Sequence, residues 1–298
     1  MTLTAELFVD SKSILGEGPI WDNQKQVLFW VNIQANEVLI TDPAGGETRT
    51  IDVGQMVGTV VPHTENSVML ALQEGFAQLD LDSEALTFIH DPEADIDTNR
   101  FNDGKCDPAG RFWAGTMGFS GPSGAHGSLY RMDSDYSVHK ILEDVTTSNG
   151  IVWSHDKTTM YYIDTPLGRV DAFDYDDASG DICNRRTAIT IPDGQGFPDG
   201  MTIDADGNLW VAHWGGHRIS CWDPVRAELV ETIRVPAPQV TACAFGGPNL
   251  DQLYITTARN GLDDATLAEY PHAGSLFVVT PGARGVPAFA FNGERRTG

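Results

Sequence analysis

The feature that most constrains the fold is a strand pattern that recurs six times along the 298-residue chain. Each copy contains an apolar run with a large residue at its second position; these residues are Phe29, Met69, Trp113, Tyr161, Trp210 and Tyr254. Successive copies lie about 40 to 50 residues apart, which is the spacing of propeller blades. Because a pair of β-sandwiches would not produce so regular a repeat, we favour a propeller.

The copy between residues 196 and 233 illustrates the expected unit. A short β-type run at 201–203 is followed by the turn Asp204-Ala-Asp-Gly-Asn208 and a second apolar run at 209–214, the pattern of a hairpin. Third and fourth strands follow at 218–223 and 229–233. The expected fold is therefore all-β: a six-bladed β-propeller with about four antiparallel strands per blade, forming a single domain over residues 1–298. Residues 262–270 could add one short helix.

A propeller ring must be closed by a terminal strand. Residues 4–9 precede the first inner strand and have the pattern of an outer strand, so we expect them to pair with the last blade. Residues 286–291 compete for this role, and the sequence does not decide between the two termini.

The charge of the chain excludes several classes of partner. With 19 basic and 42 acidic residues the net charge is −23, which argues against nucleic acid and anionic membranes. No apolar run approaches the ~18 residues of a membrane span, and residues 1–10 lack the pattern of a signal peptide. We expect a cytoplasmic monomer. The four cysteines have no CxxC spacing and are expected to be free, buried thiols: Cys106, Cys183, Cys221 and Cys243.

Three polar residues share one position in the repeat, at the start of an inner strand. Glu17, Asn149 and Asp199 each carry a side-chain oxygen and are followed directly by glycine, which lets the backbone turn and approach a central group closely. Two carboxylates and an amide suit Ca²⁺, Mg²⁺ or Mn²⁺, and zinc also accepts carboxylates. A single Asn-Gly or Asp-Gly is more often a turn, so the hypothesis depends on their shared position. The turn at 204–207 only partly matches a calcium loop and is interpreted as a hairpin turn.

Several motifs together resemble a known family. Leu15-Gly-Glu-Gly18, Asn99-Arg-Phe-Asn-Asp-Gly104, Ser148-Asn-Gly150 and Pro198-Asp-Gly200 look like the signature of the regucalcin/gluconolactonase family of sugar-lactone lactonases, and most of all like bacterial aldonolactonases. The resemblance covers nearly the whole chain. It implies a six-bladed propeller and one divalent metal ion, Ca²⁺, Zn²⁺, Mg²⁺, Mn²⁺ or Fe²⁺, bound by Glu17, Asn149 and Asp199.

The resemblance also implies roles in catalysis. Arg100 and Asn102 would hold the sugar lactone with support from Asp103, and Asp199 would act as the catalytic base or acid. A divalent ion can polarise the carbonyl and lower the pKa of a water molecule. Whether Asp199 or a water activated by the ion provides the effective base stays open. The chain has no Gly-x-Ser-x-Gly elbow for a covalent route.

One departure from the family affects the substrate. Animal members place a substrate-contacting Glu shortly after the Gly-Thr-Met motif, whereas residues 118–126, which follow Met117, contain no carboxylate. The sequence therefore predicts metal-dependent hydrolysis of a pentono- or gluconolactone to the aldonic acid in sugar catabolism, without naming the sugar or ring size. A phosphotriester or aryl-ester hydrolase and a non-catalytic calcium-binding propeller stay open, because a fold does not specify a function.

Overall fold

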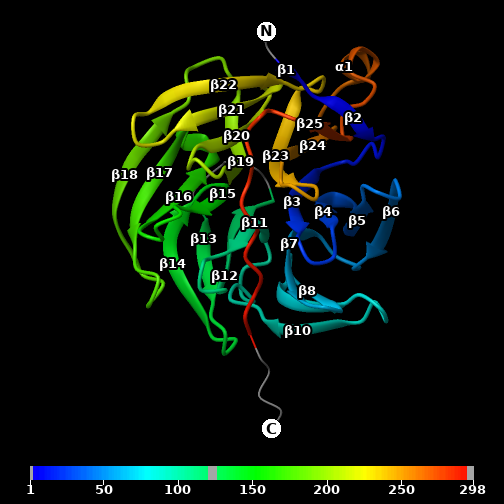
Figure 1. Cartoon of the computed structure of the whole chain (residues 1–298). Coiled ribbons are helices and arrows are strands. Elements are labelled where there is room, and N and C mark those ends of the chain that lie inside the picture. The colour runs from blue at the N-terminus through cyan, green and yellow to red at the C-terminus, as the bar shows by residue number, and fades with distance from the viewer. Residues whose placement is uncertain (1–2, 120–125, 294–298) are drawn as a thin grey trace.

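The computed structural model describes residues 3–119 and 126–293, which form almost only β-strands. Four separate antiparallel sheets have four strands each (Figure 1). The first two contain β3 (Gly16–Asp22), β4 (Val27–Asn32), β5 (Glu37–Asp42) and β6 (Glu47–Asp52), then β7 (Val57–Thr64), β8 (Ser67–Leu72), β9 (Gly75–Asp80) and β10 (Leu86–His90). The next two contain β11 (Asn99–Cys106), β12 (Phe112–Gly118), β13 (Gly127–Met132) and β14 (Val138–Val145), then β15 (Ser148–Trp153), β16 (Thr159–Asp164), β17 (Arg169–Tyr175) and β18 (Ile182–Thr190).

A nine-stranded sheet contains the remaining strands. One part comprises β19 (Phe197–Ile203), β20 (Leu209–Trp214), β21 (Arg218–Asp223) and β22 (Glu228–Arg234). The other comprises β23 (Gln239–Gly246), β24 (Gln252–Ala258) and β25 (Leu276–Val279), and the two parts are joined only where Trp214 pairs with Gln239. The strands β1 (Leu3–Thr4) and β2 (Glu6–Val9) complete this sheet.

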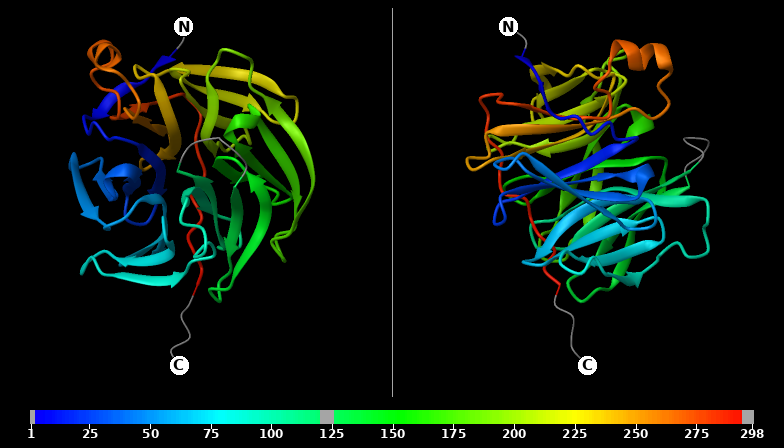
Figure 2. Two further views of the ribbon diagram at one scale, coloured as in Figure 1. Left: turned by 180° about the vertical axis from the view of Figure 1, so that it is seen from behind. Right: turned by 90° about the vertical axis from the view of Figure 1, so that its right-hand side faces the viewer.

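The first strand of each group lies innermost, and these strands contact one another in the closed series β3, β7, β11, β15, β19, β23 and back to β3. The two opposite views in Figures 1 and 2 show the sheets radiating from this centre. This architecture is consistent with a β-propeller. The predicted short helix is confirmed as α1 (Asp264–Glu269), and two 3₁₀ turns lie at Ile33–Ala35 and Thr165–Leu167. Among the described residues, no helix is both long and apolar enough to cross a bilayer.

The hairpin turns are held by a recurring carboxylate–indole bond. Asp204 Oδ2 accepts from Trp210 Nε1 at 2.9 Å, and Asp107 Oδ2 accepts from Trp113 Nε1 at the same distance of 2.9 Å. Asp204 Oδ1 also accepts from the backbone N–H of Asp206 and of Asn208. The interpretation of residues 204–207 as a turn is therefore confirmed, because both carboxylate oxygens are bonded within the hairpin.

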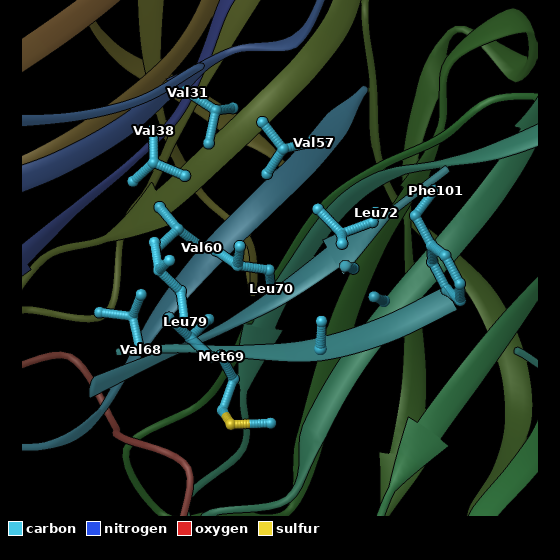
Figure 3. Packing of buried hydrophobic residues seen from close by; sticks show 14 of the residues in the cluster. Val31, Val38, Val57, Val60, Val68, Met69, Leu70, Leu72, Leu79 and Phe101 are labelled. Atoms are coloured by element: carbon cyan, nitrogen blue, oxygen red, sulfur yellow. The ribbon is translucent and has the colours of Figure 1, made fainter. Parts of the chain in front are cut away.

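The repeated apolar positions form the core between sheets. All six residues at the second position of the predicted apolar runs are buried. Between the first two sheets, Val31 and Val38 pack toward Val57 and Val60 (Figure 3). Burying such branched side chains is the main stabilising contribution in stacked sheets. The cysteines are free as predicted, but Cys183 is exposed rather than buried because it lies on the outer strand β18.

The N-terminal segment closes the ring, as predicted. β2 pairs antiparallel with β25, with Leu7 opposite Phe277, and β1 adds parallel to β22, with Leu3 opposite Ile233. Residues 286–291 form no strand and cross one face of the molecule (red in Figure 1). Their end is held where the N–H of Phe291 donates to the carbonyl of Pro62 at 2.8 Å.

Removing residues 1–9 should lower the melting temperature by on the order of 10 °C, because β25 and β22 lose their edge partners and Phe8 and Val9 leave a hydrophobic cluster. Differential scanning calorimetry measures this change. Glu6→Gln is the control, since it preserves the backbone pairing of an exposed residue. An unchanged melting temperature in the truncated protein would show that β2 does not close the ring.

Candidate functional site

Every inner strand has an irregularity in its pairing near the same end of the channel. The register shifts between Glu17 and Ile20 in β3, between Phe101 and Gly104 in β11, between Ser148 and Ile151 in β15, and between Pro198 and Met201 in β19. Similar shifts occur in β7 and β23. A bulge turns side chains out of the normal alternation of a strand. The polar residues of the motifs lie in or beside these bulges.

A cavity of about 470 Å³ opens at this end of the channel, and it brings together five of the six predicted site residues: Glu17, Arg100, Asn102, Asn149 and Asp199. All five are buried. Asp103 differs, since it lines a small separate pocket farther along the channel together with Lys105.

The last inner strand, β23, contributes no residue to the lining of the acidic cavity. Gln239 and Thr241, at its start, do not line the cavity. The hydroxyl of Thr241 instead donates to the carbonyl of Gly16 at 2.6 Å and so links the last inner strand to the first. Thr241 therefore helps to hold the ring together, and neither residue joins the cluster of carboxylates.

A chain of hydrogen bonds orients the amides. Arg100 Nη1 donates to Asn102 Oδ1 at 2.8 Å, and Asn102 Nδ2 donates to Asn149 Oδ1 at 3.0 Å. Asn149 Nδ2 donates in turn to Thr165 Oγ1 at 2.7 Å. The hydroxyl of Thr165 donates to the carbonyl of Pro198 at 2.8 Å. Because Asn149 Nδ2 is engaged by Thr165, Asn149 Oδ1 is held as an acceptor with a second lone pair.

Thr165 is a residue that the sequence motifs did not indicate. It lies in the 3₁₀ turn between β16 and β17, outside the inner strands, and no pattern in the repeat marks it. It nevertheless lines the cavity and joins β15 to β19 through its hydroxyl.

Three buried carboxylates share this part of the channel. Burial, and secondarily repulsion from Asp103, raises the pKa of Glu17 to about 8. Burial also raises the pKa of Asp199 well above its ordinary value, and Glu17 and Asp103 add to this effect. The opposing cations are Arg100, whose pKa burial lowers to about 10, and Lys105. Burial and mutual repulsion thus disfavour the ionised carboxylates, and a further positive charge in the cavity would stabilise them.

The glycines of the motifs serve two purposes: Gly18 has a positive φ of 53°, as expected where the backbone turns, whereas Gly150 and Gly200 differ from the prediction. A Cβ on Gly150 would lie 2.8 Å from the backbone nitrogen of Met201, and a Cβ on Gly200 would lie 2.5 Å from Cβ of Ala242. Both glycines therefore allow close contact with the next inner strand, not with a central group. The channel is narrow because its inner strands approach this closely.

The rim of the cavity is largely apolar. Met117, Phe119, Phe197 and Trp214 line it, together with the amides of Gln34 and Asn260. The repeat did not indicate these residues, which come from strand ends and loops. Residues 120–125 of the loop predicted to affect specificity lie outside the described residues.

His213 is a buried structural residue that does not line the acidic cavity. It is fully buried, with Nδ1 at 2.9 Å from the carbonyl oxygen of Gln195 and Nε2 at 2.5 Å from Ser220 Oγ. Because the carbonyl can only accept, the neutral ring carries its proton on Nδ1. Burial lowers the pKa of His213 to about 4.

The sheets surround a channel, and carboxylates, an arginine and amides are buried at one of its ends. This arrangement is that of a propeller protein with an acidic site. The chain belongs to the SMP-30/Gluconolactonase/LRE-like family, whose model matches residues 15–259.

Named relatives match almost the whole chain. The predicted sugar lactone lactonase YvrE of Bacillus subtilis (strain 168) is 39% identical over 98% of this chain and 100% of its own length. Regucalcin of Danio rerio is 37% identical over 98% of this chain and 99% of its own length. Among solved structures, the calcium-binding protein regucalcin from Agrobacterium tumefaciens str. C58 superimposes with a TM-score of 0.93 at 28% identity, covering 98% of this chain and 99% of that one.

Acid should destabilise the protein through His213. Its folded pKa of about 4 lies below the ordinary 6.5, so stability is complete above pH 6.5 and falls as the pH drops toward 4. This group alone should cost roughly 3 kcal/mol by pH 4. Urea unfolding from pH 7 to pH 4 should therefore show a smaller loss for His213→Gln than for the unchanged protein. Equal losses would contradict the assignment.

Proposed function

We propose that the protein hydrolyses a sugar lactone in the cavity at the acidic mouth of the channel. The observation that carries the proposal is the gathering of Glu17, Asn149, Asp199 and Arg100, all buried, in one cavity. Membership of the family and the name of the Bacillus subtilis relative support lactone hydrolysis as the reaction class. The substrate we propose is a pentono- or gluconolactone, and the product is the aldonic acid.

We propose Glu17, Asn149 and Asp199 as the residues that hold a divalent metal ion. The donor set fits a hard cation because it offers two carboxylates and an amide oxygen that the Asn102 and Thr165 bonds keep in place. The raised pKa values of Glu17 and Asp199 support the same assignment, because a bound cation would favour the ionised carboxylates that burial disfavours. Within residues 3–119 and 126–293 no group of three or more His, Cys, Asp or Glu side chains could hold a metal ion, so the amide of Asn149 is part of the proposed donor set. Three protein donors would leave positions open for water and substrate, since Ca²⁺ takes about six to eight oxygen ligands.

Asp199 is the proposed general base. When bound, the ion would supply Lewis-acid polarisation of the lactone carbonyl and lower the pKa of a water molecule. Asp199 takes the proton of the attacking water and returns it to the ring oxygen as the ester bond breaks. Its position in a buried cavity restricts competing water, which strengthens such proton transfers.

Arg100 and Asn102 are the proposed substrate-binding residues. Arg100 Nη1 is held by the carbonyl of Phe101 at 2.9 Å and by Asn102 Oδ1, which directs the guanidinium to the cavity that it lines. A guanidinium in this position can bond substrate hydroxyls and stabilise the developing oxyanion. The amide of Asn102 is already hydrogen-bonded to Arg100, Ser148 and Asn149, so Asn102 acts mainly by positioning these residues.

Asp103 is proposed as a supporting residue rather than a direct substrate contact. Its Oδ1 accepts from the N–H of Gly104 at 2.7 Å, and it lines the deeper pocket with Lys105. Its charge raises the pKa of both Glu17 and Asp199, so it sets the electrostatic environment of the cavity.

The proposal extends to the number of blades and domains around the site. We infer that residues 1–298 form one domain of six blades, in which the nine-stranded sheet counts as two. The support is its single junction at Trp214 and Gln239 and the ring of contacts between inner strands.

Asp199→Asn should lower kcat by about 10²- to 10⁴-fold if this carboxylate is the base. Divalent metal content must be measured on the same sample, because the substitution also changes a proposed ligand. Asp206→Asn, in the exposed turn between β19 and β20 of the same hairpin, is the matched control. Retained turnover with metal still bound would exclude the base role.

Thr165→Val should weaken binding of Ca²⁺ or Mn²⁺ by about tenfold, because Asn149 loses the bond that orients its amide. Isothermal titration calorimetry measures the affinity, and a melting curve checks that the fold is intact. Thr158→Val, in an exposed turn, is the control. An unchanged affinity would remove Asn149 or its orientation from the metal site.

The function itself is tested by following acid release from γ- and δ-lactones of pentoses and hexoses with a pH indicator. Metal-stripped protein is assayed with Ca²⁺, Mg²⁺, Mn²⁺, Zn²⁺ or Fe²⁺ added singly. Turnover restored by one ion on a subset of sugars is the expected result. Rates no higher than spontaneous hydrolysis with every pair would refute the proposed function.

A further inference from the structure

A second cavity lies at the opposite end of the channel. It has a volume of about 340 Å³ and is lined by the distal ends of inner strands and by residues 286–289 of the C-terminal segment, which crosses this face in Figure 1. The pocket lined by Asp103 and Lys105 lies along the channel between the two ends. The second cavity shares no lining residue with the acidic one.

The charge of this cavity is opposite to that of the chain. Its lining includes Lys105, Lys157 and His155 but no Asp or Glu, although the whole chain has 42 acidic and 19 basic residues. Lys105 donates to the carbonyl of Met201, and Lys157 pairs with Asp177 at 3.3 Å at the surface. Asp177 and the carboxylates of the acidic end partly offset these two ammonium groups, but no carboxylate lines the cavity itself, so the lining favours an anionic over a cationic ligand.

The remaining walls are apolar and aromatic. Val152, Ile203, Phe245 and Phe289 contribute apolar surface, and Phe289 is 40% exposed. The volume falls in the range of about 300 to 1,000 Å³ that is usual for small-molecule sites. The ligand that fits such walls has an apolar body as well as a negative charge.

Two indole groups of the lining lack hydrogen-bond partners. Nε1 of Trp21 and of Trp153 are buried donors that no described residue bonds, and they are the two donors among the five such side-chain atoms in the described part of the chain. Buried donors in folded proteins are nearly always bonded. Both nitrogens are covered by protein, so a bond from a ligand oxygen would require a shift of the ring, which the Trp153→Phe variant below tests.

We propose that this end of the channel binds an amphipathic organic carboxylate. Its apolar body would occupy the space among Val152, Ile203, Phe245 and Phe289. Its carboxylate would accept from the lysine ammonium groups and from the indole N–H of Trp21 or Trp153. The site is independent of the proposed hydrolysis, because none of its lining residues belongs to the acidic cavity.

The test compares four probes on the full chain by isothermal titration calorimetry. Octanoate and 4-phenylbutyrate combine an apolar body with a carboxylate, octan-1-ol lacks the charge, and acetate lacks the body. Octanoate or 4-phenylbutyrate should bind at least about tenfold more tightly than either control, since a bond to a charged group and apolar burial both contribute. Equal binding of octanoate and octan-1-ol, or no binding of either carboxylate, would overturn the proposal.

Substitutions of residues that line the distal cavity show where octanoate binds. Lys157→Gln, Trp153→Phe and Phe289→Ala should each weaken octanoate binding, by about tenfold for the loss of a bond to the charge. Lys140→Gln on β14 removes the same charge outside the cavity lining and should leave the affinity unchanged. If Lys157→Gln and Phe289→Ala bind octanoate normally, or if Asp199→Asn abolishes binding, the anion binds elsewhere and the proposal is wrong.

Discussion

The close approach of the inner strands is the constraint on which the rest of the structure depends. Glycines such as Gly150 and Gly200 leave no room for a Cβ against the next inner strand. At the same level each strand carries a bulge, which turns the side chains of Asn149 and Asp199 out of the normal alternation. The narrow ring and the bulges together bring residues from separate sheets into one cavity, and neither feature would suffice alone.

That convergence has an electrostatic cost, which the surrounding residues partly offset. Burial and mutual repulsion raise the pKa of Glu17 and Asp199, while Arg100 and Lys105 oppose the effect. The channel therefore has two chemically different ends: an acidic cavity suited to a cation and a distal cavity whose lining has no carboxylate. Lys105 lines the distal cavity and also the small pocket that contains Asp103. The ionisable side chains along the channel therefore change from acidic to basic within a single strand, β11.

Much of the fold could be predicted because its signals are local. Alternating apolar runs and turn residues predicted the strands. They left two candidates for closing the ring, and β2 shows that the N-terminal one, residues 4–9, pairs with the last sheet. The start of the outer strand β18 at Ile182 could not be predicted from an apolar pattern, because most of its side chains are exposed. Five of the six predicted site residues line one cavity, whereas Asp103 faces the next pocket, since a bulge changes which neighbour lines which space.

The sequence by itself determined the repeated strand units, the turns and the types of polar residue at the strand starts, because these depend on neighbours a few positions apart. Only the tertiary structure decided that Thr165 orients Asn149, that Phe197 and Trp214 form the rim, and that the C-terminal segment covers the distal cavity. Those relations join residues from different sheets, and their partners are selected by the curvature of the ring and by the bulges. Local periodicity carries no information about either.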